Sequence, residues 1–413
     1  MSATIQHIAI NDTTSIPIIF EQDNSLPTFN LQLVFKNSGY MQDKKQSGIA
    51  NISAKLLNEG TKELGSIKFA DKLESKAISL ETSNGFETFV IELSCLKSES
   101  KTALKLLEKL LKSPNFTQNT LDKIKTTQMG ILKRKENDFD YIAQNNLKKL
   151  IFKGTPLENS SNGTIQSIST IKLKDVKNFI HNAITLNNLI VVAGGDFSFT
   201  ELEKSIHDIL LSIPNGNENT LQIIQAQEKP SVHEEIKDTQ QAYIYFGSPY
   251  HLEAQNKKNY IAKVASFILG GSGFGSRLME EIRVKRGLAY SAYGSISINK
   301  SHTYFTGYLQ TKLESATEAK ELVKSLIEEF VKNGVTQKEL DSAKKFLSGS
   351  EPLRTETLSQ RLNRAFTYYY RGLDPDFAQQ ELNNIEKLSL DELNAFIKSH
   401  NEIQNLSFSI VRK

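Results

Sequence analysis

Alternating apolar and polar residues predict two strands, one in each half of the chain. The run FNLQLVF, residues 29–35, and the run AYIYFGS, residues 242–248, both have the period of two that a half-buried strand requires. Each run is followed by a polar turn and then by apolar residues at helical spacing, residues 48–59 and residues 257–269. The pattern therefore predicts the order strand, turn and long helix twice.

Two more pairs of similar segments follow in the same order. Residues 117–122, TQNTLD, return as residues 336–341, TQKELD, and residues 173–180, LKDVKNFI, return as residues 390–397, LDELNAFI. Each copy then ends in a strand candidate, residues 188–193 and residues 406–411. Three matches in order and at a nearly constant offset indicate an internal duplication.

The chain is therefore expected to form two homologous α+β domains. Residues 212–238 are rich in Asn, Gln, Glu and Lys and include Pro214 and Pro230, a composition that is typical of a linker. The domains are then residues 1–211 and residues 239–413. Because neither half shows the regular β-α-β alternation of a parallel sheet, each is expected to hold a mainly antiparallel sheet packed with helices.

Composition is that of a globular protein and argues against several classes of function. Of the 413 residues, 38% are hydrophobic, and 22 Phe and 13 Tyr supply core material for more than one domain. A net charge of +3 gives no general case for nucleic acid or a membrane surface, and no apolar run is long enough to span a bilayer. Residues 1–22 alternate like a strand and lack the form of a signal peptide, so a cytoplasmic location is expected.

Common metal, nucleophile and phosphate motifs do not occur. Cys95 is the single cysteine, which excludes an intrachain disulfide and a thiolate metal cluster. The Gly-rich run of residues 271–275 lacks the Lys and Ser or Thr that would complete a phosphate-binding loop. No two of the seven histidines are close enough in sequence for a local chelate: His7, His181, His207, His233, His251, His302 and His400.

The segment of residues 270–293, GGSGFGSRLMEEIRVKRGLAYSAY, carries the most promising chemistry. Arg283 and Tyr290 are seven residues apart, and Gly287 between them can end a helix. A tyrosine hydroxyl can donate to a developing oxyanion, and an arginine can bind a substrate carbonyl. The alternative is structural: Arg283 as a helix-end cation and Tyr290 as a core aromatic.

This segment and residues 48–61, GIANISAKLLNEGT, resemble two signatures of the pitrilysin/insulinase peptidases, or inverzincins, in their short two-domain form. In that family a Gly-hydrophobic-Ala triplet precedes His-x-x-Glu-His, and Gly-Thr follows it. Here Asn51 and Lys55 replace the two histidines and Ala54 replaces the glutamate. Imidazoles at i and i+4 share a helix face and bind one zinc, whose water gives its proton to the glutamate. The residues present here supply neither function.

A residue suitable as the third zinc ligand is also missing from the position where the family has one. In the family a glutamate about 76 residues beyond the second histidine completes the zinc site, and the same count from Lys55 ends near Ile131. Residues 123–135 include no acidic residue. The resemblance therefore implies a chain with a degenerate zinc motif, no bound metal and no catalytic residue of its own, with zinc in a partner subunit.

The resemblance also implies a role in peptide hydrolysis. In the family, two such units face each other around a chamber, and Arg and Tyr of one half hold the substrate at the zinc of the other. Arg283 and Tyr290 would then make this chain the substrate-clamping subunit of a heterodimeric metalloendopeptidase. The peptide would add as a strand to the edge formed by residues 81–94, where Ser79 and Leu80 replace the family's common Asn-Ala pair.

Three other functions remain open. The chain is either a purely structural subunit, a homodimer that binds peptide without cleaving it, or an active zinc peptidase with ligands elsewhere. In the structural case, changing Arg283 or Tyr290 leaves the activity of any partner intact.

Overall fold

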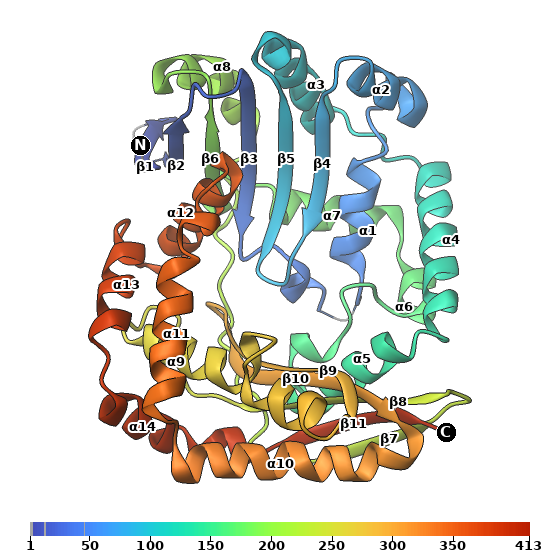
Figure 1. The fold of residues 1–413 in the computed structure, drawn as a ribbon. Helices are drawn as coiled ribbons and strands as arrows, with labels where there is room; N and C mark the ends of the chain where they lie inside the picture. The colour runs from blue at the N-terminus through green and yellow to red at the C-terminus, as the bar shows by residue number, and fades with distance from the viewer. Residues whose placement is uncertain (1–2, 12–13, 45) are drawn as a thin grey trace. The chain divides into compact units, whose positions relative to one another are not determined.

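The computed structural model describes residues 3–11, 14–44 and 46–413. The chain forms two compact units, each built on one sheet (Figure 1). The first unit comprises Met1–Arg134, Ser160–Leu221 and Arg354–Thr367, and the second comprises Lys135–Asn159, Gln222–Leu353 and Tyr368–Lys413.

The first sheet has the strand order β1-β2-β6-β3-β5-β4. Strands β2 and β6 pair in parallel, and the other described neighbours are antiparallel. The strands are β1 (Thr4–Ala9), β2 (Ser15–Gln22), β3 (Thr28–Lys36), β4 (Ser79–Asn84), β5 (Thr88–Leu96) and β6 (Leu189–Gly195).

The second sheet has five strands and repeats the order of the first from β2 onward, so β1 has no counterpart among its described strands. Its order is β7-β11-β8-β10-β9, in which β7 and β11 are parallel and the other described neighbours antiparallel. The strands are β7 (Val232–Ile236), β8 (Gln241–Pro249), β9 (Ala289–Ile298), β10 (Thr303–Lys312) and β11 (Ser407–Arg412). The predicted α+β class and the two homologous, mainly antiparallel sheets are confirmed.

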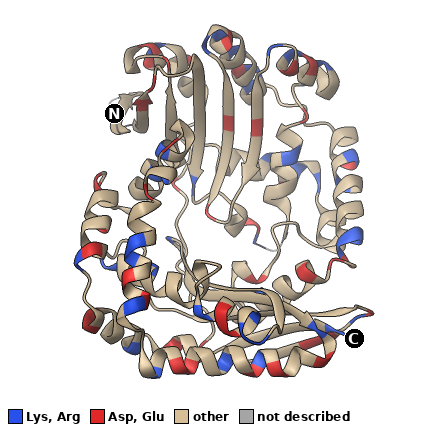
Figure 2. Ribbon diagram, in the orientation of Figure 1, with Lys and Arg blue, Asp and Glu red and all other residues tan. Residues whose placement is uncertain are grey.

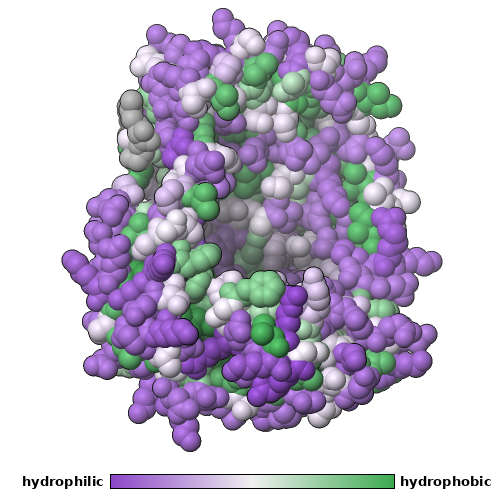
Figure 3. Space-filling model, in the orientation of Figure 1, coloured by the Kyte–Doolittle hydropathy of each residue, from purple (hydrophilic) through white to green (hydrophobic). Residues whose placement is uncertain are grey.

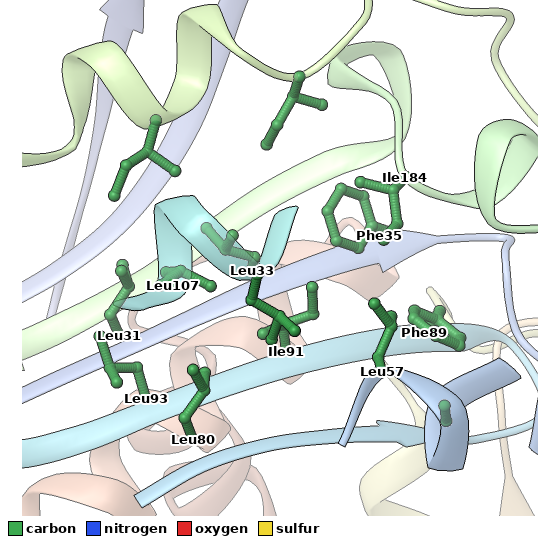
Figure 4. Packing of buried hydrophobic residues seen from close by; sticks show 14 of the residues in the cluster. Leu31, Leu33, Phe35, Leu57, Leu80, Phe89, Ile91, Leu93, Leu107 and Ile184 are labelled. Carbon is green, nitrogen blue, oxygen red and sulfur yellow. The ribbon is translucent and has the colours of Figure 1, made fainter. Parts of the chain in front are cut away.

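Helices pack on one face of the first sheet. Leu31, Leu33 and Phe35 alternate along β3, and Leu107 of α3 packs against them in one apolar layer (Figure 4). The helices of the first repeat that lie in this unit are α1 (Ile49–Leu57), α2 (Gly65–Glu74), α3 (Ser100–Lys112), α4 (Gln118–Lys135), α6 (Ile165–Thr170), α7 (Leu173–Ala183) and α8 (Phe199–Leu211).

The second sheet has a core of the same kind. Phe246, Phe305 and Phe408 lie together under its helices. The outer surface of α10 carries both signs of charge in alternation (Figure 2), as expected of a solvated helix face. The helices are α9 (Asn259–Ser266), α10 (Ala316–Asn333), α11 (Gln337–Gly349), α13 (Phe377–Lys387) and α14 (Leu390–Ser399).

One helix of each sequence repeat belongs, wholly or in part, to the compact unit of the other repeat. α5 (Phe139–Ile151) follows the first repeat's α4 but belongs to the second unit, and α12 (Leu358–Arg371) follows α11 but begins in the first. Each helix packs closely against its sheet at a glycine. A Cβ atom added to Gly247 would contact side chains of α5, and a Cβ atom added to Gly194 would contact Leu358 and Leu362 of α12. The compact units therefore differ from the contiguous repeats, whose boundaries at residues 211 and 239 stay a prediction.

Several predicted elements differ in detail. Residues 81–94 were expected as one strand but form part of the β4–β5 hairpin, because Gly85 donates its N–H to the Thr88 carbonyl and turns the chain. Part of the predicted linker forms β7. The helix predicted over residues 257–269 is α9 followed by a π-helical turn, Phe267–Gly271.

In the described parts of the chain, no helix has the length and apolar character needed to cross a membrane.

Candidate functional site

The buried carboxylate of Asp43 fixes the start of α1, the helix with the degenerate zinc motif. Gly48, at φ 93°, precedes the helix in a conformation that favours glycine. Asp43 accepts N–H bonds from Gly48 at 2.6 Å and from Ala50 at 3.0 Å, so it satisfies donors that the first helical turn leaves free. Burial raises the pKa of Asp43 to about 7, against the effect of these bonds.

The residues at the motif positions are held in a hydrogen-bonded network. Asn51 Nδ2 donates to Asn162 Oδ1 at 3.1 Å, and Lys55 Nζ donates to Gln128 Oε1 at 2.5 Å. Gln128, which is fully buried, donates its Nε2 to the Asn162 carbonyl at 3.0 Å. The two helix positions and Gln128 are therefore tied together by their own contacts.

This set of donors does not fit zinc. It offers two neutral amides and the ammonium of Lys55, whereas zinc sites in proteins use imidazole, thiolate or carboxylate. Ala54 is buried and has no group that accepts a proton from water. Within the described residues, no three His, Cys, Asp or Glu side chains are grouped to hold a metal.

Gln128 is a site residue that sequence reasoning missed. The count from Lys55 ended at Ile131, three positions further along the same helix, α4. The side chain that reaches Lys55 is that of Gln128. The search was for an acidic residue, and a neutral glutamine gave no signal. Asn162 gave none either, because it lies in a turn far from both helices in sequence.

The predicted pair in the second half is brought together by a change of helix type. Residues Met279–Val284 form a π-helical turn, in which Lys285 donates its N–H to the Glu280 carbonyl. Gly287, at φ 63°, ends the turn, and β9 begins two residues later. Arg283 and Tyr290 thereby lie side by side, with the guanidinium carbon 4.5 Å from the ring centroid.

A third side chain completes this cluster. Phe274 lies 4.7 Å from the Arg283 guanidinium carbon, so the cation contacts two aromatic rings. Gly273 and Gly275, with φ of 68° and 89°, flank Phe274 in the Gly-rich loop. Tyr290 is 81% exposed and Phe274 is 69% exposed. Exposed aromatic side chains of this size are unusual on a protein surface, which is mainly hydrophilic over the face drawn in Figure 3. A phenylalanine between glycines was a sequence signal that was not used.

The polar groups of this cluster are available to a ligand. Glu281 accepts hydrogen bonds from Lys285 at 2.5 Å and from Arg286 at 2.6 Å, and these bonds lower its pKa. Arg283 and the Tyr290 hydroxyl make no hydrogen bond or ion pair with any described residue. Aromatic contacts occupy the faces of a guanidinium and leave its N–H edges free. Tyr290 is therefore not a core aromatic, and the pair presents unused donors.

Comparisons with known proteins agree with the geometry. Residues 18–165 match the family Insulinase (peptidase family M16), and residues 170–347 match the Peptidase M16 inactive domain. A Helicobacter pylori protein named "Non-peptidase homolog YmxG" is 46% identical over 410 residues, which cover 99% of this chain and 94% of that protein. This chain belongs to peptidase family M16. The family resemblance found in the sequence is confirmed.

Two further proteins are similar to this chain. A Pseudomonas fluorescens crystal structure described as a peptidase M16 inactive domain has a TM-score of 0.91 and 24% identity, with 100% of this chain and 98% of that chain covered. Subunit 1 of the mitochondrial cytochrome b-c1 complex of Saccharomyces cerevisiae is 24% identical over 271 residues, 62% of this chain and 56% of that protein.

A partly buried ion pair anchors the Gly-rich loop of this M16 chain. Arg277, directly after the loop, donates to both carboxylate oxygens of Glu339 at 2.6 and 2.9 Å and to the Gly334 carbonyl at 2.8 Å. Glu339 also accepts the N–H and hydroxyl of Thr336 and so caps α11. Burial opposes the change, but the bonds from Arg277 and Thr336 lower the pKa of Glu339 to about 2.

Replacing Arg277 with Gln is expected to lower the free energy of unfolding by about 1–2 kcal/mol at pH 7, since solvent screens part of this partly exposed pair. The pKa of Glu339 is lower in the folded chain, so its stabilisation is present above about pH 4.5 and is lost toward pH 2. Urea denaturation at pH 7 and pH 3 should therefore show a smaller difference at pH 3. An unchanged difference would contradict the assignment. Arg277→Lys, which keeps only the charge, should be intermediate.

Proposed function

We propose that this M16 homologue is not a peptidase on its own and that it supplies Arg283 and Tyr290 to a zinc-bearing homologous subunit. The single observation that carries the proposal is the contrast between the two halves of the chain. Asn51, Lys55 and Gln128 are engaged with one another or with Asn162. Arg283 and Tyr290 are adjacent, and both keep free donors. The name of the Helicobacter relative, a non-peptidase homologue, supports the first part.

The chemistry of the pair suits binding a peptide at the moment of cleavage. Arg283 would donate its N–H edge to a carbonyl next to the scissile bond, and Tyr290 would donate its hydroxyl to the developing oxyanion. Neither group removes a proton from water at neutral pH, so activated water has to come from the partner's zinc. The proposed heterodimer acts on peptides and is cytoplasmic, because residues 1–22 lack the form of a signal peptide.

The test is to purify this chain alone and together with a homologue from the same cell that has an intact His-x-x-Glu-His motif, and to measure zinc content and peptide cleavage. The lone chain should be metal-free and inactive, and the pair active. Tyr290→Phe should lower kcat of the pair by about 100-fold or more, the usual loss for an oxyanion donor. Arg283→Ala should lower kcat/KM by about 100-fold, because the substrate carbonyl is no longer held in position.

Lys285→Ala is the matched control, because Lys285 lies in the same segment but pairs with Glu281. It should leave cleavage unchanged. A lone chain that holds one zinc and cleaves peptide would refute the proposal. So would an active pair whose rate is unaffected by both Arg283→Ala and Tyr290→Phe.

The second candidate is a structural subunit. The observation that favours it is that Arg283 is already stacked on Phe274 and Tyr290, which is enough to order the loop without any ligand. One relative is named as a subunit of the cytochrome b-c1 complex. In this case the double variant Arg283→Ala with Tyr290→Phe should lower the stability of the complex without changing the partner's cleavage rate. Self-association without a homologue, measured by light scattering, would instead favour a peptide-binding homodimer.

A further inference from the structure

Strand β4 is the outer strand of the first sheet, so one row of its backbone groups faces away from β5. In an antiparallel pair, successive residues alternate between facing the partner and facing outward. Gly85 bonds to Thr88 across the hairpin, which places Ser83 and Glu81 toward β5. Leu80 and Thr82 therefore direct their N–H and C=O groups to the outer edge. Such free groups are what an incoming strand recognises.

The side chain of Asn58 already occupies the edge at Thr82. Its Nδ2 donates to the Thr82 carbonyl at 3.0 Å, and its Oδ1 accepts the Thr82 N–H at 2.7 Å. A carboxamide presents a donor and an acceptor side by side, which is the same pair that a residue of an antiparallel strand presents. Asn58 therefore makes with Thr82 the two bonds that a bound peptide would make.

The position of Asn58 is well fixed. It is the residue after α1, and its N–H bonds to the Ala54 carbonyl. Leu57, the preceding residue, is buried in the core with Phe89 and Leu80 (Figure 4). The helix end is thus anchored in the same apolar layer as β4 and β5, and the Asn58 side chain lies across the edge without a large loss of entropy.

We infer that Asn58 closes the β4 edge of this chain against strand addition. The first half would then bind no extended peptide at Thr82, in contrast to the expectation from residues 81–94. This inference does not depend on the role of Arg283 and Tyr290, which lie in the other unit. It implies that a peptide held by a heterodimer adds to an edge of the partner.

The second sheet supplies an internal comparison. Its outer strand is β9, and there Ser266 Oγ accepts the Ile296 N–H at 3.0 Å. Backbone blocks this edge as well, since a Cβ on Gly270 would lie 2.5 Å from the Gly294 nitrogen and 2.7 Å from its carbonyl oxygen. At Thr82 the outer backbone groups are covered by one side chain, that of Asn58. It is therefore removable by a single substitution.

The test replaces Asn58 with Leu, which branches at the same carbon and has no hydrogen-bonding group. Hydrogen exchange, resolved to single amides by mass spectrometry, should show Thr82 protected in the wild type and exchanging about 10-fold faster in Asn58→Leu, the effect of one lost hydrogen bond. A fluorescein-labelled peptide of alternating Thr and Val with terminal Lys should bind the variant, by fluorescence anisotropy, and not the wild type. Both measurements use the full-length chain alone.

Two further variants keep the test decisive if Asn58→Leu folds poorly. Asn58→Asp retains the acceptor for the Thr82 N–H and loses the donor to its carbonyl, so it should keep amide protection yet bind the peptide weakly. Ser266→Ala should speed exchange at Ile296, leave Thr82 protected and create no peptide binding. Equal peptide binding by wild type and Asn58→Leu, or unchanged exchange at Thr82 in the folded variant, would overturn the inference.

Discussion

Replacing Arg361 with Leu is expected to destabilise the chain by about 3–5 kcal/mol, the usual cost of leaving a buried charge without its partner. Arg361, on the exchanged helix α12, donates to Glu21 at 2.7 Å and to Asp23 at 2.5 Å. Its third nitrogen donates to the Thr355 and Glu356 carbonyls at 3.1 Å. Glu21 is 3% exposed, and its second carboxylate oxygen, Oε2, is buried without a hydrogen-bond partner in the described structure. The Arg361 guanidinium thus joins α12 to Glu21 at the end of β2 and to Asp23 just after it.

Urea denaturation followed by circular dichroism and tyrosine fluorescence measures this effect, because the chain has 13 Tyr and no Trp. The double change Arg361→Leu with Glu21→Leu should recover most of the loss, since replacing both partners by apolar groups removes the unpaired charge. Arg286→Leu is the surface control: its pair with Glu281 is exposed, and the expected loss is below about 1 kcal/mol. A loss of that small size for Arg361→Leu would contradict the anchoring role.

Local patterns in the sequence were sufficient to predict the architecture. Period-two alternation predicted β3 and β8, and the helical spacing after each predicted α1 and α9. Apolar residues recur along these elements where they face a core, so the periodicity of the sequence indicates the type of each element. The repeated segments starting at Thr117 and Thr336 also have a local cause, since Thr336 caps α11 through Glu339.

Features that depend on contacts between residues far apart in the chain could not be predicted from the sequence. The exchange of α5 and α12 leaves the apolar pattern of either helix unchanged, because each still covers a sheet of the same kind. The bond between Lys55 and Gln128 joins residues 73 positions apart, and the contact of Asn58 with Thr82 uses an ordinary polar residue at a helix end. No periodicity or motif marks such pairs. The seven-residue step from Arg283 to Tyr290 gave a signal only through the family resemblance.

Restoring four side chains is expected to give this chain a zinc site. The variant carries Asn51→His, Ala54→Glu, Lys55→His and Gln128→Glu. Positions 51 and 55 share one face of α1, and the hydrogen bond from Lys55 to Gln128 shows that position 128 reaches that face. The change removes an ammonium and supplies two imidazoles and two carboxylates. The imidazoles and the carboxylate at position 128 are a ligand set that zinc accepts, and the carboxylate at position 54 supplies the base. Purified variant should hold about one zinc per chain, by elemental analysis after dialysis, and wild type none.

The control exchanges Gln128 for Ala in place of Glu and leaves the other three changes. It should bind zinc at least about 100-fold more weakly, because outer-shell partners alone change metal affinity by 10- to 100-fold and a direct ligand contributes more. Equal affinity of the two variants would show that position 128 is not the third ligand position. A folded four-residue variant that binds no zinc would show that the loss of metal binding has a cause beyond Asn51, Lys55 and Gln128, and that the α1 and α4 backbones themselves have moved out of ligand geometry.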